Sequence, residues 1–178
     1  MLNQRVFLFS LLLGLLGAVA SFAASETSFD NSVFAFSCTS PEDASDPLEC
    51  SIGQYGSAGE ATAAGLSKSY DKWADFVVAL DNDMRETYSA NGLNITLKTD
   101  FDLGGSRVDK GTTSCVNNFV PIDFELYTEK LKKFNGGNHT IRNFCHIVSS
   151  GDAGFFRHIP TNATVDRLTF EGAYVKTT

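Results

Sequence analysis

Two short segments near the end of the chain share one pattern at a fixed spacing. Residues 140–144 and 164–168 both follow the order Thr, apolar, polar, polar, apolar, and equivalent positions lie 24 residues apart. A repeat period of about 20–50 residues is typical of chains whose repeats stack as successive coils. Between the copies lie the glycines Gly151 and Gly154 and the pair Phe155 and Phe156, as a coil with a corner requires. This spacing predicts a repetitive, solenoid-like β structure.

Two elements are predicted upstream of this repeat from the spacing of their apolar residues. A helix over 73–84 is predicted because five apolar residues fall at steps of three and four: Trp73, Phe76, Val77, Leu80 and Met84. After the Asn-Gly pair at 91–92 the period changes to two, which predicts a strand over 93–97. Trp73 is interpreted as a core-facing aromatic residue, with sugar stacking as the alternative.

The first 24 residues have the features of a cleavable signal peptide. Arg5 precedes an uncharged, leucine-rich run over 6–20, which is shorter than the ~20 apolar residues that span a bilayer. Small residues flank Phe22, so cleavage is expected after Ala23 or Ala24, and an uncleaved anchor is the alternative. The mature protein is therefore expected to be secreted or held at the cell surface, with no integral membrane span.

Residues 25–66 differ in composition from the rest of the chain. They are rich in Ser, Ala, Gly, Asp and Glu, they show little apolar periodicity, and Pro41 and Pro47 interrupt them. Such a composition is typical of flexible linkers. We therefore predict a flexible low-complexity linker over 25–66, followed by one folded unit over 67–178.

Four cysteines form an even set in an exported chain: Cys38, Cys50, Cys115 and Cys145. Disulfides are therefore predicted. Three pairings are possible. We favour Cys38 with Cys50 and Cys115 with Cys145, because the first two share the low-complexity segment and the other two share the folded part. A zinc site is the alternative, but the chain has neither CxxC nor HxxxH spacing.

The formal net charge of −7 limits the classes of partner. Nucleic acids and anionic membranes need clustered Lys and Arg, and the short cluster Lys130, Lys132 and Lys133 is interpreted as solvated surface. Polysaccharides or other cell-surface molecules are the partners expected instead. No cofactor is predicted, because the chain has neither a phosphate-binding loop nor a dinucleotide fingerprint.

A few polar residues could carry chemistry. Asp100 and Asp102 are two apart on an extended segment, so they would face one side and could act as an acid pair or hold a cation. His139 could act as a base, but the sequence offers it no partner. We interpret the two carboxylates as solvated turn residues and His139 as a turn residue, and we assign no catalytic, cofactor-binding or metal-binding residue.

Several segments follow one another in an order that resembles a known family. They are 97–105, Pro121 with Ile122, 134–141, 154–156 and 163–168. Together they resemble the opening coils of right-handed parallel β-helix proteins with GLUG-like repeats, which occur in large secreted and surface proteins of bacteria. The resemblance covers roughly residues 70–178. That family usually has Gly-Asn-Gly-His at a structural turn, whereas this chain has Gly136, Gly137, Asn138 and His139.

The resemblance implies both a fold and a function. The expected fold is mostly β, the start of a right-handed parallel β-helix of the pectate-lyase-like kind, with 73–84 as an N-terminal capping helix and further coils beyond residue 178. The expected function is that of a secreted or surface-exposed, non-catalytic β-helix segment serving adhesion, structure or display. The alternative is the N-terminal part of a carbohydrate-active β-helix enzyme whose catalytic coils lie beyond residue 178.

Overall fold

The computed structural model describes residues 32–40, 42–43, 45–86, 91–104, 115, 119–124 and 131–177. The predicted signal peptide over 1–24 lies outside these residues and stays a prediction. Within the described part of the chain, no helix has the length and apolar character needed to cross a membrane.

The described chain is mostly β, as predicted. Its elements are β1 (Val33–Thr39), β2 (Leu48–Tyr55), α1 (Ala58–Ala63), β3 (Lys68–Tyr70), α2 (Trp73–Glu86), β4 (Leu93–Leu97), β5 (Phe101–Asp102), β6 (Ile122–Asp123), β7 (Leu131–Arg142), β8 (Cys145–Val148), β9 (Phe156–His158), β10 (Thr164–Glu171) and β11 (Tyr174–Thr177). The helix predicted over 73–84 is confirmed as α2, and the strand predicted over 93–97 is confirmed as β4.

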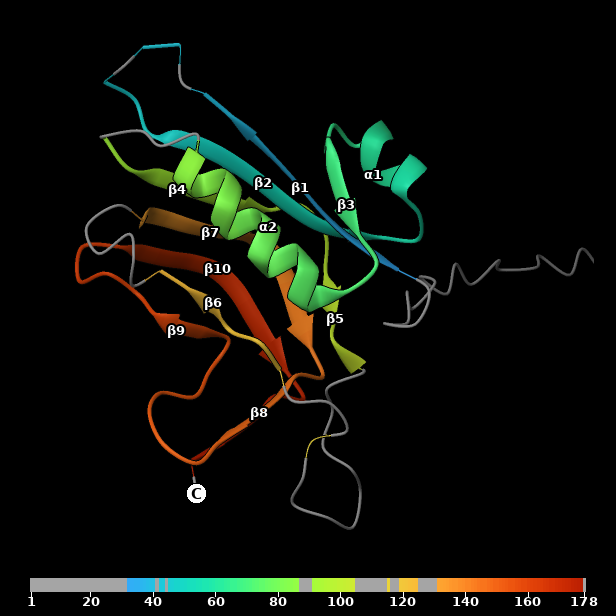
Figure 1. Cartoon of the computed structure of the whole chain (residues 1–178), viewed down its shortest axis with the longest axis vertical. Coiled ribbons are helices and arrows are strands. Elements are labelled where there is room, and N and C mark those ends of the chain that lie inside the picture. The colour runs from blue at the N-terminus through green and yellow to red at the C-terminus, as the bar shows by residue number, and fades with distance from the viewer. Residues whose placement is uncertain are drawn as a thin grey trace, which may run out of the picture.

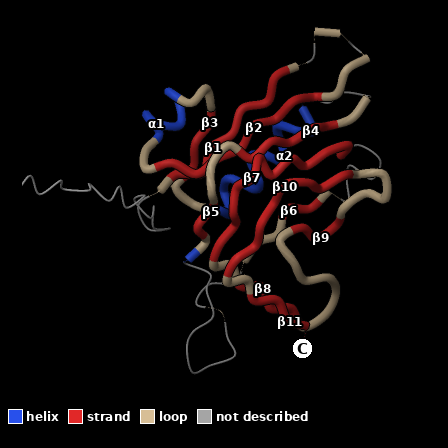
Figure 2. The backbone as a smooth tube through the Cα atoms, turned by 180° about the vertical axis from the view of Figure 1, so that it is seen from behind, coloured by secondary structure: helices blue, strands red, loops and turns tan. Residues whose placement is uncertain are grey.

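Most strands belong to one mixed sheet with the order β10-β7-β4-β2-β1-β3, in which β5 also pairs with β7 (Figure 1). β1 runs antiparallel to both β2 and β3, whereas β2 with β4, β4 with β7 and β7 with β10 are parallel pairs. Two small parallel pairs, β6 with β9 and β8 with β11, make separate sheets. Figure 2 shows β8 and β11 side by side near the C-terminus.

The predicted fold class, the start of a right-handed parallel β-helix with a capping helix, is wrong. The main sheet is mixed, because β1 forms antiparallel pairs on both of its sides. Helix α2 lies across a face of that sheet rather than over an edge (Figure 1). The 24-residue spacing is not a structural repeat either, because Thr164 pairs with Lys133 and Thr140 pairs with Thr169.

The flexible linker predicted over 25–66 is not what the described residues of that segment form. They fold into β1, β2 and α1. Phe34 and Phe36 on β1 and Leu48 and Ile52 on β2 are buried, and they alternate with smaller or polar neighbours. The average composition of the segment hid this alternation, because the polar residues on one face of each strand offset the apolar residues on the other face.

An aromatic cluster fills the space between α2 and the sheet. Trp73, 4 % exposed, packs edge-on against Phe34 at 5.2 Å and lies 5.1 Å from Phe76, measured between ring centroids. Such contacts add to the free energy gained by burying the rings. The indole Nε1 donates a hydrogen bond of 2.7 Å to the carbonyl oxygen of Val120. Trp73 is therefore confirmed as a core residue, and this bond ties α2 to the segment that leads into β6.

The predicted glycine turn lies inside β7, where it bends the strand. Gly137 and Asn138 have φ of 61° and 66°, in the left-handed region that favours glycine. A Cβ on Gly136 would lie 2.3 Å from the carbonyl oxygen of Arg167. Three residues of β7 stand opposite the single Arg167 of β10, which itself has φ of 51°. The two strands therefore bend together at this point.

Both favoured disulfides are confirmed. Cys38 and Cys50 are direct partners across the β1–β2 pair and are bonded. Cys115 is bonded to Cys145 at the start of β8. With all four thiols oxidised, none is free to bind zinc.

Candidate functional site

The outer strand edges at the C-terminal end are the most unusual surface of the described chain. β9, β10 and β11 are each the last strand of their own sheet, and they pair on one side with β6, β7 and β8. Within the described residues, no strand pairs with their other side. Backbone N–H and C=O groups along such an edge form a template for another strand.

Exposed apolar side chains gather along these edges. Of the six large exposed hydrophobic residues in the described chain, four lie on or beside β9, β10 and β11: Ile159 (46 % exposed), Val165 (38 %), Phe170 (44 %) and Val175 (44 %). We call these four side chains and the edges of the three strands the outer edge. An exposed apolar group beside unpaired backbone is typical of an interaction surface.

The register of the strands explains why Val165 and Phe170 are exposed. On β7 their direct partners are Phe134 and Ile141, which are fully buried. In a parallel pair, partner side chains share a face, so Val165 and Phe170 point to the core side of the sheet. They are exposed there because no described strand covers them. The ring of Phe170 ends the aromatic cluster at 5.7 Å from the ring of Phe155.

Edge strands of soluble proteins are usually blunted by short length, charge or a bulge. At the opposite end of the sheet, β3 is only three residues long, and its Lys68 forms an ion pair with Asp83 of α2. β10 has eight residues, and its Asp166 and Glu171 are already engaged by cations of β7. The bulge at Arg167 is the main irregularity along the edge of β10. The outer edge is thus far less protected than the edge at β3.

The structure gives His139 a partner that the sequence did not reveal. Asp100 Oδ1 lies 3.2 Å from His139 Nδ1 and accepts the N–H of Thr140 at 3.0 Å, while Oδ2 lies 3.0 Å from Arg142. Partial burial acts to raise the pKa of this carboxyl, but the three partners together hold that pKa below its usual value of 3.8. A carboxylate kept ionised in this way links the β4–β5 segment to β7, and it is poorly suited to donate a proton.

Asp102 does not join Asp100 in an acid pair. Its Oδ1 accepts hydrogen bonds from the Gly104 N–H at 2.9 Å and from Asn143 Nδ2 at 3.0 Å. Its backbone N–H donates to Gln54 Oε1 at 2.6 Å, and Gln54 is almost fully buried. The two aspartates therefore hold separate parts of the fold through part-buried hydrogen bonds, whereas the sequence predicted solvated turn residues.

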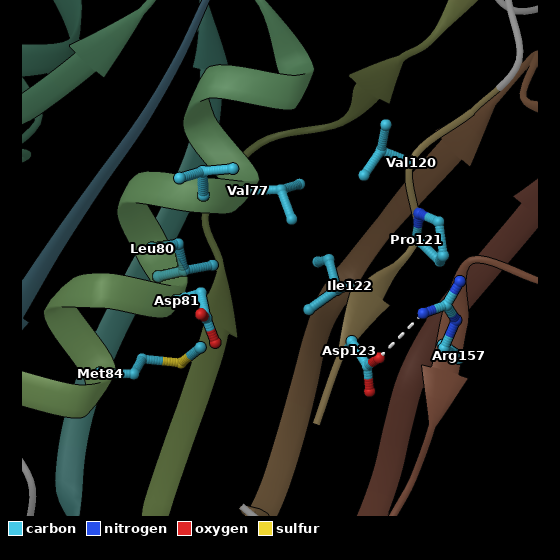
Figure 3. A pocket seen from close by; sticks show the side chains of 10 residues that line it. Val77, Leu80, Asp81, Met84, Val120, Pro121, Ile122, Asp123 and Arg157 are labelled. Carbon is cyan, nitrogen blue, oxygen red and sulfur yellow. Dashed lines mark hydrogen bonds and ion pairs between the residues drawn. The ribbon is translucent and has the colours of Figure 1, made fainter. Parts of the chain in front are cut away.

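A small groove lies between α2 and the segment that leads into β6 (Figure 3). Its volume is about 260 Å³, and its walls include Val77, Leu80 and Met84 of the helix. Asp123 and Arg157, 3.4 Å apart, form an ion pair at its rim. Ligand pockets commonly have roughly 300–1,000 Å³. The groove is therefore a weaker candidate than the outer edge.

The described residues contain no group of three or more His, Cys, Asp or Glu side chains placed to hold a metal ion. Comparisons with protein-family models, with curated proteins and with solved structures find no match. They therefore do not test the resemblance to GLUG-repeat proteins. The function has to be argued from the surface itself.

Proposed function

We propose that the mature protein is a secreted or surface-exposed, non-catalytic β module that serves adhesion, structure or display by pairing its outer edge with a strand of a partner. The carrying observation is the eight-residue edge of β10 with Val165 and Phe170 exposed on its core side. Two disulfides support an oxidising, extracellular environment.

The energetics favour strand addition at this edge. A strand laid beside β10 would bury the exposed parts of its apolar side chains, at roughly 1 kcal/mol for each large side chain. Each backbone hydrogen bond gained along the edge contributes about 0.5–1.5 kcal/mol. Several of each would give a usable affinity after the cost of association. A polysaccharide-cleaving role has less support, because Asp100 and Asp102 take separate structural partners.

A strand probe tests this proposal. A fluorescent peptide with the sequence of residues 164–171 should bind the mature protein, and a scrambled peptide of the same composition should not. Phe170→Lys should weaken binding of the peptide at least tenfold, because it puts a charge on the core side of β10. Val78→Lys is the matched control, because Val78 is exposed on α2, outside the outer edge.

Fluorescence anisotropy gives the dissociation constants. Binding that is lost in the Phe170 variant and kept in the Val78 variant supports the proposal. At concentrations where the protein sediments as a monomer, the proposal is wrong if the peptide fails to bind, or if both variants bind it as well as the parent protein does.

A further inference from the structure

We infer that the occupant of the outer edge is a second copy of this chain, bound through a two-fold axis so that β10 pairs antiparallel with β10 of the other copy. This inference rests on the proposed function, because it names the partner of the same surface. The argument starts from the pattern of side chains along β10.

Val165 and Phe170 share one face although they are five positions apart. In a regular strand an odd spacing puts two side chains on opposite faces. Here Arg167, with φ of 51°, interrupts the alternation, and both residues stack on buried partners of β7. The bulge thus places Val165 and Phe170 on the same face, one on each side of the strand's centre, with the partly buried Leu168 between them.

This arrangement makes β10 self-complementary. A two-fold axis between Arg167 and Leu168 would put Val165 of each copy opposite Phe170 of the other. Both exposed side chains would then be covered, in aromatic with β-branched pairs of the kind that stabilise sheets. An isologous contact of this kind buries each apolar residue against another, and it needs no second surface on the molecule.

The charges along β10 agree with the same register. Asp166 would lie opposite Thr169, and Glu171 opposite Thr164, in both halves of the contact. No two like charges would face each other directly: the strand also carries Arg167, which would lie opposite Leu168 beside the axis, with its Nε 3.8 Å from Oδ2 of Asp166 in its own chain. Like charges placed directly opposite would weaken the pair.

The flanking strands extend the contact. β9 precedes β10 and β11 follows it, so the same axis would bring β9 of one copy toward β11 of the other. Ile159 and Val175, 46 % and 44 % exposed, would then meet across the axis. The segment 156–177 supplies 22 residues per copy. A standard interface has roughly 20–30 residues a side, so a contact along the whole of this segment would approach that size.

A head-to-tail arrangement fits the structure less well. It would pair β10 with the opposite end of the sheet, where β3 offers only three residues. Lys68 on that strand is engaged by Asp83 and lies 5.4 Å from the centroid of the Phe36 ring. Most of the eight-residue edge would stay uncovered, and the contact would generate open chains rather than a closed pair.

Cysteine cross-linking of the mature protein separates these arrangements. Thr169→Cys and Ser69→Cys each add one exposed thiol, on β10 and β3, to a protein whose native cysteines are all bonded. In the two-fold register, residue 169 of one copy lies three residues along the strand from residue 169 of the other. A bismaleimide that spans about 11 Å fits this separation, because a strand rises about 3.3 Å per residue and neighbouring strands lie about 4.8 Å apart.

We expect Thr169→Cys alone to give a cross-linked dimer and no larger species. The yield should fall at least tenfold when Phe170→Lys is added and stay unchanged when Val78→Lys is added. Cross-links between Thr169→Cys and Ser69→Cys copies in a mixture, or a ladder of larger species, would overturn the two-fold arrangement.

Sedimentation velocity distinguishes failure of the inference from failure of the proposed function. A monomer at all concentrations that still binds the 164–171 peptide refutes the second copy as partner but leaves strand addition standing. A monomer that binds no peptide refutes both.

Discussion

Removing each disulfide separately should destabilise the protein by amounts that follow the length of the closed loop. Cys38–Cys50 closes 12 residues and Cys115–Cys145 closes 30. In the chain-entropy model these loops correspond to about 2.8 and about 3.6 kcal/mol of stabilisation. The double variant Cys115→Ala/Cys145→Ala should therefore lose about 0.8 kcal/mol more than Cys38→Ala/Cys50→Ala.

Local packing should not reverse this order. Each bond has one almost fully buried partner, Cys50 at 1 % exposed and Cys145 at 0 %, so truncation to Ala leaves comparable gaps. The Cys38–Cys50 bond also joins residues that are already direct partners in the β1–β2 ladder. It therefore adds less new restraint than the bond that ties residue 115 to β8.

Urea unfolding followed by the fluorescence of Trp73 measures both variants, because Trp73 is the single tryptophan and lies in the core. The linear dependence of the unfolding free energy on urea gives the two values. A larger loss for the Cys38–Cys50 variant, or a loss below about 1 kcal/mol for both variants, would refute the reasoning from loop length.

Three further predictions concern single residues. Gly136→Ala would place a methyl group 2.3 Å from a backbone oxygen of β10, so thermal melts should show a loss of about 1–3 kcal/mol, whereas Gly59→Ala, which would meet only Ser57 Oγ at 3.8 Å, should lose no stability. Gln54→Leu removes the acceptor of the Asp102 N–H and two donated bonds, and urea unfolding should show a cost of about 1–3 kcal/mol. Burial lowers the pKa of His146 in the folded protein below its usual 6.5. At a pH between the folded-state and unfolded-state pKa values, the unfolded chain therefore binds more protons than the folded protein does. Stability should therefore be complete above about pH 6.5 and decline as the pH falls through it, which melting temperatures between pH 8 and pH 5 can check, with a smaller decline in His146→Gln.

The spacing of apolar residues within a single segment correctly predicted the helix or strand that the segment forms. The steps of three and four around Phe76 gave α2, and the alternation around Ile95 gave β4 at its observed bounds. The disulfide pairing was also predictable, because in each pair the two cysteines belong to the same part of the chain. In these cases the physical signal lies within one element or one loop.

The rest of the fold depends on contacts that no local pattern carries. β1 lies between β2 and β3 and runs antiparallel to both, an arrangement that exists only because both strands pair with it. The similar segments starting at Thr140 and Thr164 take different positions in the β7–β10 register. Asp100 and His139 are 39 residues apart, and they meet only when the segment after β4 lies beside β7. Long-range pairing of this kind is set by the whole sheet, so the sequence could not reveal it.

Hydrogen exchange at β10 tests the central claim most directly. Mass spectrometry of the protein at low and high concentration would follow the amides of the peptide that covers residues 164–171. If the outer edge binds a second copy, these amides should become at least tenfold slower to exchange at high concentration, while those of β4 stay unchanged. Exchange of this peptide that does not depend on concentration, in a protein that sediments as a larger species, would show that the association uses another surface and would contradict the account.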